Sequence, residues 1–224
     1  MSKHSHRTIR GMRIIHEDDD LIVIDKAAGV LSQATRCGAS SRQREYNVED
    51  ALGDWVRKGQ SRSRKRVYLV HRLDRDTSGV MMVAKNEEVQ DYFRSRWNEI
   101  TAKTYLALVE GKMDAPSGVF ESYLCEDPKT LNVHSVADPA RGKLSRTEWK
   151  VLRELRNASL VKVNLKSGRR NQIRVHFAEA GHPVCGDARY GGGKGGLRLH
   201  AWRLAFVHPR TGETCEFESP PPRW

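Results

Sequence analysis

Short apolar runs with a period of two constrain the fold of this 224-residue chain more than any other feature. In 159–166, Val161, Val163 and Leu165 alternate with polar residues, as in a half-buried strand. Further strand candidates lie at 103–109, 118–124, 131–136, 145–152, 197–207 and 214–219. Because these runs do not alternate regularly with helices, they predict an α+β fold with a large mixed, mostly antiparallel β-sheet.

Three segments have the apolar periodicity of helices. Asn47 is placed to cap a helix over 48–56, and Asn86 to cap a second helix whose apolar stripe runs over 89–100. A third helix is expected over about 170–181, where a glycine followed by a proline ends it.

The N-terminal part of the chain begins with residues 1–12, which are expected to be a disordered basic tail. The runs 13–16 and 21–26 flank an acidic turn, a pattern that predicts a β-hairpin. No linker or repeat interrupts 13–224, so this segment is expected to form a single domain.

A polar nonapeptide, His71–Gly79 with the sequence HRLDRDTSG, lies between the apolar runs 67–70 and 80–84. A rigid scaffold presents catalytic groups on such loops. Asp74 lies between Arg72 and Arg75, and these cations favour an ionised carboxylate that can act as a base or nucleophile. The structural alternative is a carboxylate that only caps the loop.

Net charge points to the class of partner. The chain carries 39 Lys and Arg against 28 Asp and Glu, a net charge of +11, which favours a polyanion such as nucleic acid. A surface charged only for solubility is the alternative. Six of ten residues in 57–66 are basic and none is acidic, which suits phosphate contacts without base specificity: Arg57, Lys58, Arg62, Arg64, Lys65 and Arg66.

Several classes of protein are disfavoured. No apolar run approaches the roughly 20 residues that span a bilayer, so no membrane partner is expected. The four cysteines lack zinc-ligand spacing and predict reduced thiols in a cytoplasmic protein, and the nine histidines form no metal cluster. The glycine run 191–196 is read as a connector, because a phosphate loop needs Lys-Ser/Thr opening a helix.

Four ordered segments resemble the RluA family of pseudouridine synthases. Residues 71–79 match its signature H-R-L-D-x-x-T-S-G, and 25–32 resemble its K-P-x-G-x-L-x element, with Ala27 in place of proline. Residues 103–111 are similar to the segment with the family's active-site tyrosine, and 167–176 to its T-G-R-x-H-Q-I-R-x-H motif, with Asn171 in place of histidine. The segments GHPVCGD at 181–187 and LHA at 199–201 follow in the expected order.

The resemblance implies a pseudouridine synthase fold, with helices flanking the sheet and a central RNA-binding cleft. It also implies an isomerase that converts specific uridines of structured RNA (rRNA and/or tRNA) to pseudouridine by base flipping. At the matched positions, Asp74 would be the catalytic carboxylate, Tyr105 would pack against the target base or accept a proton at carbon 5, and Arg174 would pair with Asp74. The isomerisation is redox-neutral, so no cofactor or metal is expected. The family's frequent S4 domain has no expected counterpart before residue 71.

Candidate RNA-binding residues are cations and one amide in or near these motifs: Arg72, Arg75, Arg169, Arg170, Asn171, Arg62, Arg64, Lys65 and Arg66. Arg72 would help to displace the target nucleotide. Three functions stay open: the isomerase, a catalytically silent RNA-binding or assembly factor of the same fold, and a nucleoside hydrolase that uses Asp74. Asp74 can act as a nucleophile or as a base on the ribose, and a monomer is the default expectation.

Overall fold

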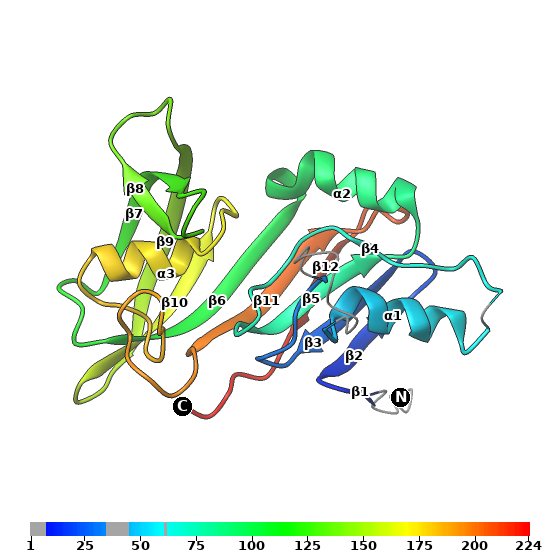
Figure 1. The fold of residues 1–224 in the computed structure, drawn as a ribbon, viewed down its shortest axis with the longest axis horizontal. Coiled ribbons are helices and arrows are strands. Elements are labelled where there is room, and N and C mark those ends of the chain that lie inside the picture. Colours follow the sequence, from blue (N-terminus) through cyan, green and yellow to red (C-terminus); the bar gives the residue numbers. More distant parts are fainter. Residues whose placement is uncertain (1–7, 35–44, 61) are drawn as a thin grey trace. The chain divides into compact units, whose positions relative to one another are not determined.

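The computed structural model describes residues 8–34, 45–60 and 62–224, which divide into two compact units. Unit 1 comprises the described residues up to Ile100 together with Leu204–Ser219, and unit 2 comprises Thr101–Arg203 and Pro220–Trp224. A single domain is expected from the sequence because no linker marks this boundary. Helix α2 (Glu87–Ile100) passes without a gap into strand β6 (Thr101–Glu110), and β11 (Leu199–Val207) begins in unit 2 and ends in unit 1 (Figure 1).

Unit 1 is built on antiparallel strands. Strand β2 pairs with β1 and β3, and β5 pairs with β3 and β4. The bounds are β1 (Thr8–Ile9), β2 (Met12–Glu17), β3 (Leu21–Lys26), β4 (Tyr68–Leu69), β5 (Ser78–Ala84) and, after β11, β12 (Thr214–Glu218). The predicted N-terminal hairpin is confirmed as β2 and β3.

The first strand of unit 1 starts within the segment that the sequence predicts to be a disordered tail. Thr8 pairs with Arg13 and Ile9 with Met12, and Gly11 turns the chain with φ of 69°, a conformation that favours glycine. Residues 8 and 9 therefore belong to the sheet and residues 10 and 11 form the turn into β2, because β2 offers an edge to pair with. Residues 1–7 of the predicted tail lie outside the described residues.

Two helices of unit 1 have the predicted caps. In α1 (Val48–Arg57) the Asn47 side chain accepts from the backbone N–H of Asp50 at 2.9 Å, and at α2 the Asn86 side chain accepts from the N–H of Val89 at 2.9 Å. One apolar face of α2 packs into a core cluster to which strands β3, β5 and β11 also contribute. The buried residues of that cluster are Leu21, Val23, Val80, Met82, Ala84, Val89, Phe93, Ile100, Leu204 and Phe206.

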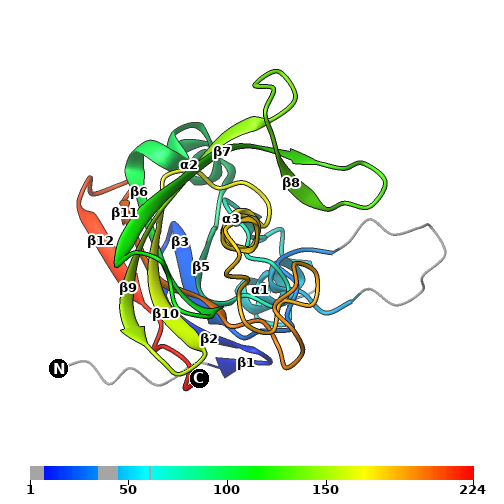
Figure 2. The ribbon, with the colours of Figure 1, turned by 90° about the vertical axis from the view of Figure 1, so that its left-hand side faces the viewer.

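Unit 2 is an antiparallel sheet with one helix on its face. The strand order is β6-β10-β9-β7-β8, with β7 (Ser117–Glu126), β8 (Val133–Val136), β9 (Lys143–Glu154) and β10 (Ala158–Leu165). Helix α3 (Gln172–Glu179) packs through Ile173 and Phe177 on side chains that include Val109, Trp149 and Val163 (Figure 2). The strands predicted within 103–166 and the third helix are confirmed.

The α+β class is also confirmed. Every strand pair described within either unit is antiparallel, and one isolated parallel bridge joins Leu31 to Asn47. In the described part of the chain, α1, α2 and α3 all lack the combination of length and apolar character that a membrane-crossing helix requires.

Candidate active site and RNA-binding residues

The site residues predicted from the sequence are divided between the two units. Asp74, Arg72 and Arg75 belong to unit 1, whereas Tyr105 and Arg174 belong to unit 2.

The loop that carries Asp74 is held by segment 26–32. The buried Ser32 hydroxyl donates to the carbonyl of Leu73 at 2.6 Å and accepts from the N–H of Leu73 at 3.1 Å. The N–H of Gly29 donates to the carbonyl of Arg75 at 2.8 Å. Hydrogen bonds therefore fix the backbone on both sides of Asp74, as a preorganised catalytic group requires.

Lys26 is the main residue of this site that the sequence analysis missed. It is fully buried, and its Nζ donates to the carbonyls of Ala27 at 3.0 Å, Val30 at 2.8 Å and Arg75 at 3.0 Å. Burial lowers the pKa of Lys26 to about 8, against the opposing charges of Asp76 and Asp74. A buried ammonium thus ties segment 26–32 to the Asp74 loop and lies close enough to Asp74 to interact with its charge.

Ala27, one of the two departures from the family pattern, has a structural role of its own. Its N–H donates to the carbonyl of Gly11 at 2.9 Å, a bond that proline cannot form. This bond joins the β1–β2 turn to segment 26–32.

In the described residues, the charges of the flanking arginines are not paired directly with Asp74. Arg75 donates to the carbonyl of Gly29 at 3.3 Å and forms an ion pair with Glu45 at 3.4 Å. The exposed Arg72 forms no ion pair with any described residue. Neighbours in sequence diverge here because the chain turns at this loop. Their assignment as RNA-binding residues stays a prediction.

His71 opens the same loop and has a structural role. Its Nε2 accepts from the N–H of Met82 at 3.0 Å, and its ring stacks on Trp97 with centroids 4.6 Å apart. These contacts join the start of the loop to β5 and α2.

Tyr105 lies on the face of β6 that α3 covers. It is partly buried against the core cluster of Ala107, Val109 and Ile173, and it pairs with Val163 of β10. Lys103, two residues earlier in the strand, points to the same face. Burial, and then the charge of Arg169, lower the pKa of Lys103 to about 8.

Arg174 is held by a buried carboxylate that sequence reasoning did not single out. Its Nε and Nη2 donate to the two oxygens of Asp187 at 2.6 and 2.7 Å, and the Asp187 side chain is completely buried. Its Nη1 donates to Asn171 Oδ1 at 3.0 Å, and its guanidinium lies over the Tyr190 ring at 5.2 Å. Three of its five N–H groups are thus used in orienting the side chain. Its pairing with Asp74 stays a prediction.

Asn171, the second departure from the family pattern, supports this arrangement. It is buried, its Oδ1 accepts from Arg174, and its Nδ2 donates to the Tyr190 hydroxyl at 3.1 Å. Both ends of the amide are therefore engaged within the protein. These contacts favour a positioning role for Asn171 over direct RNA binding, which stays untested.

The remaining candidate RNA-binding residues are exposed cations. Arg170 pairs with Glu126, whereas Arg169 forms no ion pair with any described residue. Arg57 ends α1 and pairs with Asp54 at 2.6 Å, so it is not part of the basic loop. Four loop cations are exposed and unpaired among the described residues: Arg62, Arg64, Lys65 and Arg66. Within the described residues, no cluster of three or more His, Cys, Asp or Glu side chains is arranged to hold a metal ion.

The mostly antiparallel α+β fold and the hydrogen-bonded Asp74 loop agree with the class of protein that the sequence resembles, the RNA uridine-modifying isomerases. Residues 20–179 match the family model described as RNA pseudouridylate synthase. The chain belongs to this family, whose members convert uridine in RNA to pseudouridine.

Individual relatives agree with this assignment. Ribosomal large subunit pseudouridine synthase D of Nitrosomonas europaea is 33% identical over 233 residues, which cover 94% of this chain and 62% of the relative. The RNA pseudouridine synthase YlyB of Bacillus subtilis is 33% identical over 219 residues, which cover 93% of this chain and 69% of YlyB. The chain thus spans less than two thirds of the Nitrosomonas protein.

Solved structures share the fold. Human RNA pseudouridylate synthase domain containing 4 has a TM-score of 0.74 at 22% identity, with 96% of this chain and 89% of that chain covered. Human RNA pseudouridylate synthase domain containing 1 has a TM-score of 0.73 at 23% identity, with 96% and 85% covered.

Proposed function

We propose that this chain is an RNA pseudouridine synthase that isomerises specific uridines of structured RNA, with Asp74 as the catalytic carboxylate. The observation that carries the proposal is the complete HRLDRDTSG loop, fixed on both sides of Asp74 by segment 26–32, in a chain of this family.

The proposed reaction places separate demands on the site. The bond from N1 of uracil to the sugar breaks, the base rotates, and carbon 5 forms the new bond while its proton leaves and N1 gains one. Asp74 assists as a nucleophile or as a base on the ribose. Extruding the base costs a few kcal/mol, which stacking on the Tyr105 ring offsets by about 1–3 kcal/mol. Arg174, oriented by Asp187, would keep Asp74 ionised in the closed site.

The RNA is proposed from charge and from the relatives. A net charge of +11 and the exposed basic loop at 62–66 support a polyanionic substrate. The Nitrosomonas relative is named for the ribosomal large subunit, so large-subunit rRNA is our first candidate substrate and tRNA the second. We further propose a monomer, since the proposed catalytic residues all come from one chain, and a cytoplasmic location, since the spacing of the four cysteines favours reduced thiols.

Tritium release tests the proposal. RNA transcripts that carry tritium at carbon 5 of uridine are incubated with the wild-type chain and with Asp74→Asn. Isomerisation releases tritium to water, and Asp74→Asn should abolish the release while leaving the backbone contacts of the loop intact. Asp76→Asn, a change of the exposed carboxylate two residues away, is the matched control and should retain most of the activity.

The alternative functions give different products. A nucleoside hydrolase would release free uracil, and a silent RNA-binding factor would release neither uracil nor tritium. Tritium release that Asp74→Asn leaves unchanged would contradict the assignment of Asp74.

A further inference from the structure

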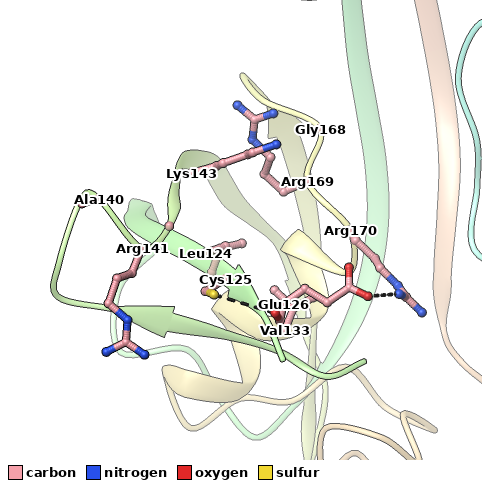
Figure 3. Close-up of a pocket in the computed structure, with 11 residues that line it drawn as sticks. Leu124, Cys125, Glu126, Val133, Ala140, Arg141, Lys143, Gly168, Arg169 and Arg170 are labelled. Carbon is pink, nitrogen blue, oxygen red and sulfur yellow. Dashed lines mark hydrogen bonds and ion pairs between the residues drawn. The ribbon is translucent and has the colours of Figure 1, made fainter. Parts of the chain in front are cut away.

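A pocket of about 440 Å³ in unit 2 lies outside the residues assigned to chemistry. Three parts of the unit line it: the β7–β8 hairpin, the turn 140–143 that leads into β9, and the loop 168–170 before α3 (Figure 3). This volume lies within the range of about 300–1,000 Å³ that small-ligand sites occupy. A single nucleotide fits such a space, whereas a nucleic-acid helix does not.

The pocket has an apolar floor and a cationic rim. Leu124, Cys125 and Val133 contribute to the floor, and four cations come from two separate parts of the sequence: Arg141, Lys143, Arg169 and Arg170. Figure 3 shows Lys143 and Arg169 at one end of the pocket and Arg141 at the other, with Arg170 turned toward Glu126.

The charges of the rim are not balanced within the described residues. Glu126 is the one carboxylate of the lining, and it is engaged by Arg170. Arg141, Lys143 and Arg169 have no ion pair with any described residue. The charge of Arg169 also acts on Lys103, whose pKa it lowers in addition to the effect of burial. Uncompensated like charges gathered at one site favour binding of an anion.

The loop that carries Arg169 is held by the buried side chain of Gln172. Gln172 Oε1 accepts from the backbone N–H of Arg169 at 3.0 Å and from the hydroxyl of Ser167. Gln172 Nε2 donates to Thr147 and to the carbonyl of Arg146. The backbone is thus fixed while the guanidinium of Arg169 stays exposed. This loop leads directly into α3, the helix of Arg174.

We propose that this pocket binds one nucleotide of the RNA substrate other than the target uridine. Lys143 and Arg169 hold its phosphate, Arg141 contacts the neighbouring phosphate, and the base lies on the floor of Leu124 and Val133. The proposal rests on the proposed function for the identity of the ligand. Such phosphate contacts fix the register of the RNA without reading its sequence.

The first test removes rim charges and leaves the catalytic groups in place. The double variant Arg141→Gln, Lys143→Gln should bind the tritiated rRNA transcript at least tenfold more weakly and raise KM with little change in kcat. The slope of log affinity against log salt should become shallower by roughly 0.7 for each lost phosphate contact.

The matched control changes one lysine and one arginine farther along β9, Lys150→Gln and Arg153→Gln. Both are exposed and unpaired among the described residues. Lys150 lies seven residues beyond Lys143, roughly 20 Å at the rise of a strand. If RNA binding were weakened equally in this control and in the Arg141→Gln, Lys143→Gln double variant (the rim variant), the proposal would be overturned.

The second test uses the wild-type chain and the thiol inside the pocket. Bound RNA should slow alkylation of Cys125 several-fold, with Cys215 of unit 1 as the internal reference, both followed by peptide mass spectrometry. RNA that binds without protecting Cys125, or polyglutamate that protects it better than RNA, would overturn the proposal, the latter in favour of an acidic protein partner.

The two proposals fail separately. Protection of Cys125 without tritium release would refute the isomerase and keep the pocket. Tritium release with unchanged KM in the rim variant would refute the pocket and keep the isomerase.

Discussion

Replacing Lys26 with methionine tests whether the buried ammonium holds the Asp74 loop. The change keeps an unbranched apolar stem and removes the three hydrogen bonds to the carbonyls of Ala27, Val30 and Arg75. A hydrogen bond from a charged donor contributes about 1.5–3 kcal/mol. Against these bonds stands the burial of the charge: lowering the pKa from 10.5 to about 8 corresponds to roughly 3 kcal/mol. The net loss in the free energy of unfolding should be about 3 kcal/mol.

The assay combines urea unfolding, followed by tryptophan fluorescence, with tritium release at a temperature where the variant is folded. Lys26 Nζ holds the carbonyl of Arg75, the residue that follows Asp74. Because small displacements of a catalytic group reduce the rate strongly, kcat should fall at least tenfold even in the folded variant.

Lys85→Met is the matched control for Lys26→Met. Lys85 also belongs to unit 1, is about one fifth exposed, and donates to the carbonyl of Asp18 at 2.5 Å and to Glu17 at 3.3 Å. Because Lys85 is partly exposed and water can replace some of its contacts, its loss should cost less stability than the loss of the fully buried Lys26. If Lys26→Met unfolded like Lys85→Met and kept wild-type turnover, the reasoning about Lys26 would be refuted.

Two further predictions concern unit 2. Arg174→Lys keeps a cation beside Asp187 but loses the paired hydrogen bonds of the guanidinium to both Asp187 oxygens and the bond to Asn171. Turnover should therefore fall about 100-fold, while the free energy of unfolding falls by no more than about 2 kcal/mol. Wild-type turnover in this variant would contradict the proposed role of Arg174. Lys103 releases its proton near pH 8 in the folded chain and near pH 10.5 in the unfolded chain, so between these values the unfolded state binds more protons and stability rises with pH. The stability of the wild-type chain relative to Lys103→Met, measured by urea unfolding, should therefore increase by up to about 3 kcal/mol across this range; a constant difference would argue against the lowered pKa.

The sequence predicts those features that depend on local patterns. The caps at Asn47 and Asn86 and the strands of both units are local, since period and capping chemistry act within a few residues. The placement of the Asp74 loop between β4 and β5 is predicted for the same reason. The family is predicted because its motifs are contiguous stretches of sequence.

The supporting contacts of the site are not predictable in this way. Lys26 bonds to a carbonyl 49 residues away, and every residue has a carbonyl, so the sequence carries no sign of the partner. Asp187 meets Arg174 at a separation of 13 residues in the sequence, whereas sequence reasoning assigned cations to Asp74 by adjacency. The division into two units is hidden for a different reason, because α2 runs into β6 without any linker composition.

The hydrogen bond from the Ala27 amide to the carbonyl of Gly11 suggests how this chain tolerates losing a proline. A proline ring restricts one torsion angle in the unfolded and folded chain alike, whereas the hydrogen bond from the Ala27 N–H forms only once both segments have folded. Stiffness at this position is therefore acquired during folding rather than built into the covalent chain. The β1–β2 turn thus supports segment 26–32, which in turn holds the Asp74 loop, so deleting this turn would disturb a proposed catalytic loop with which it shares no motif.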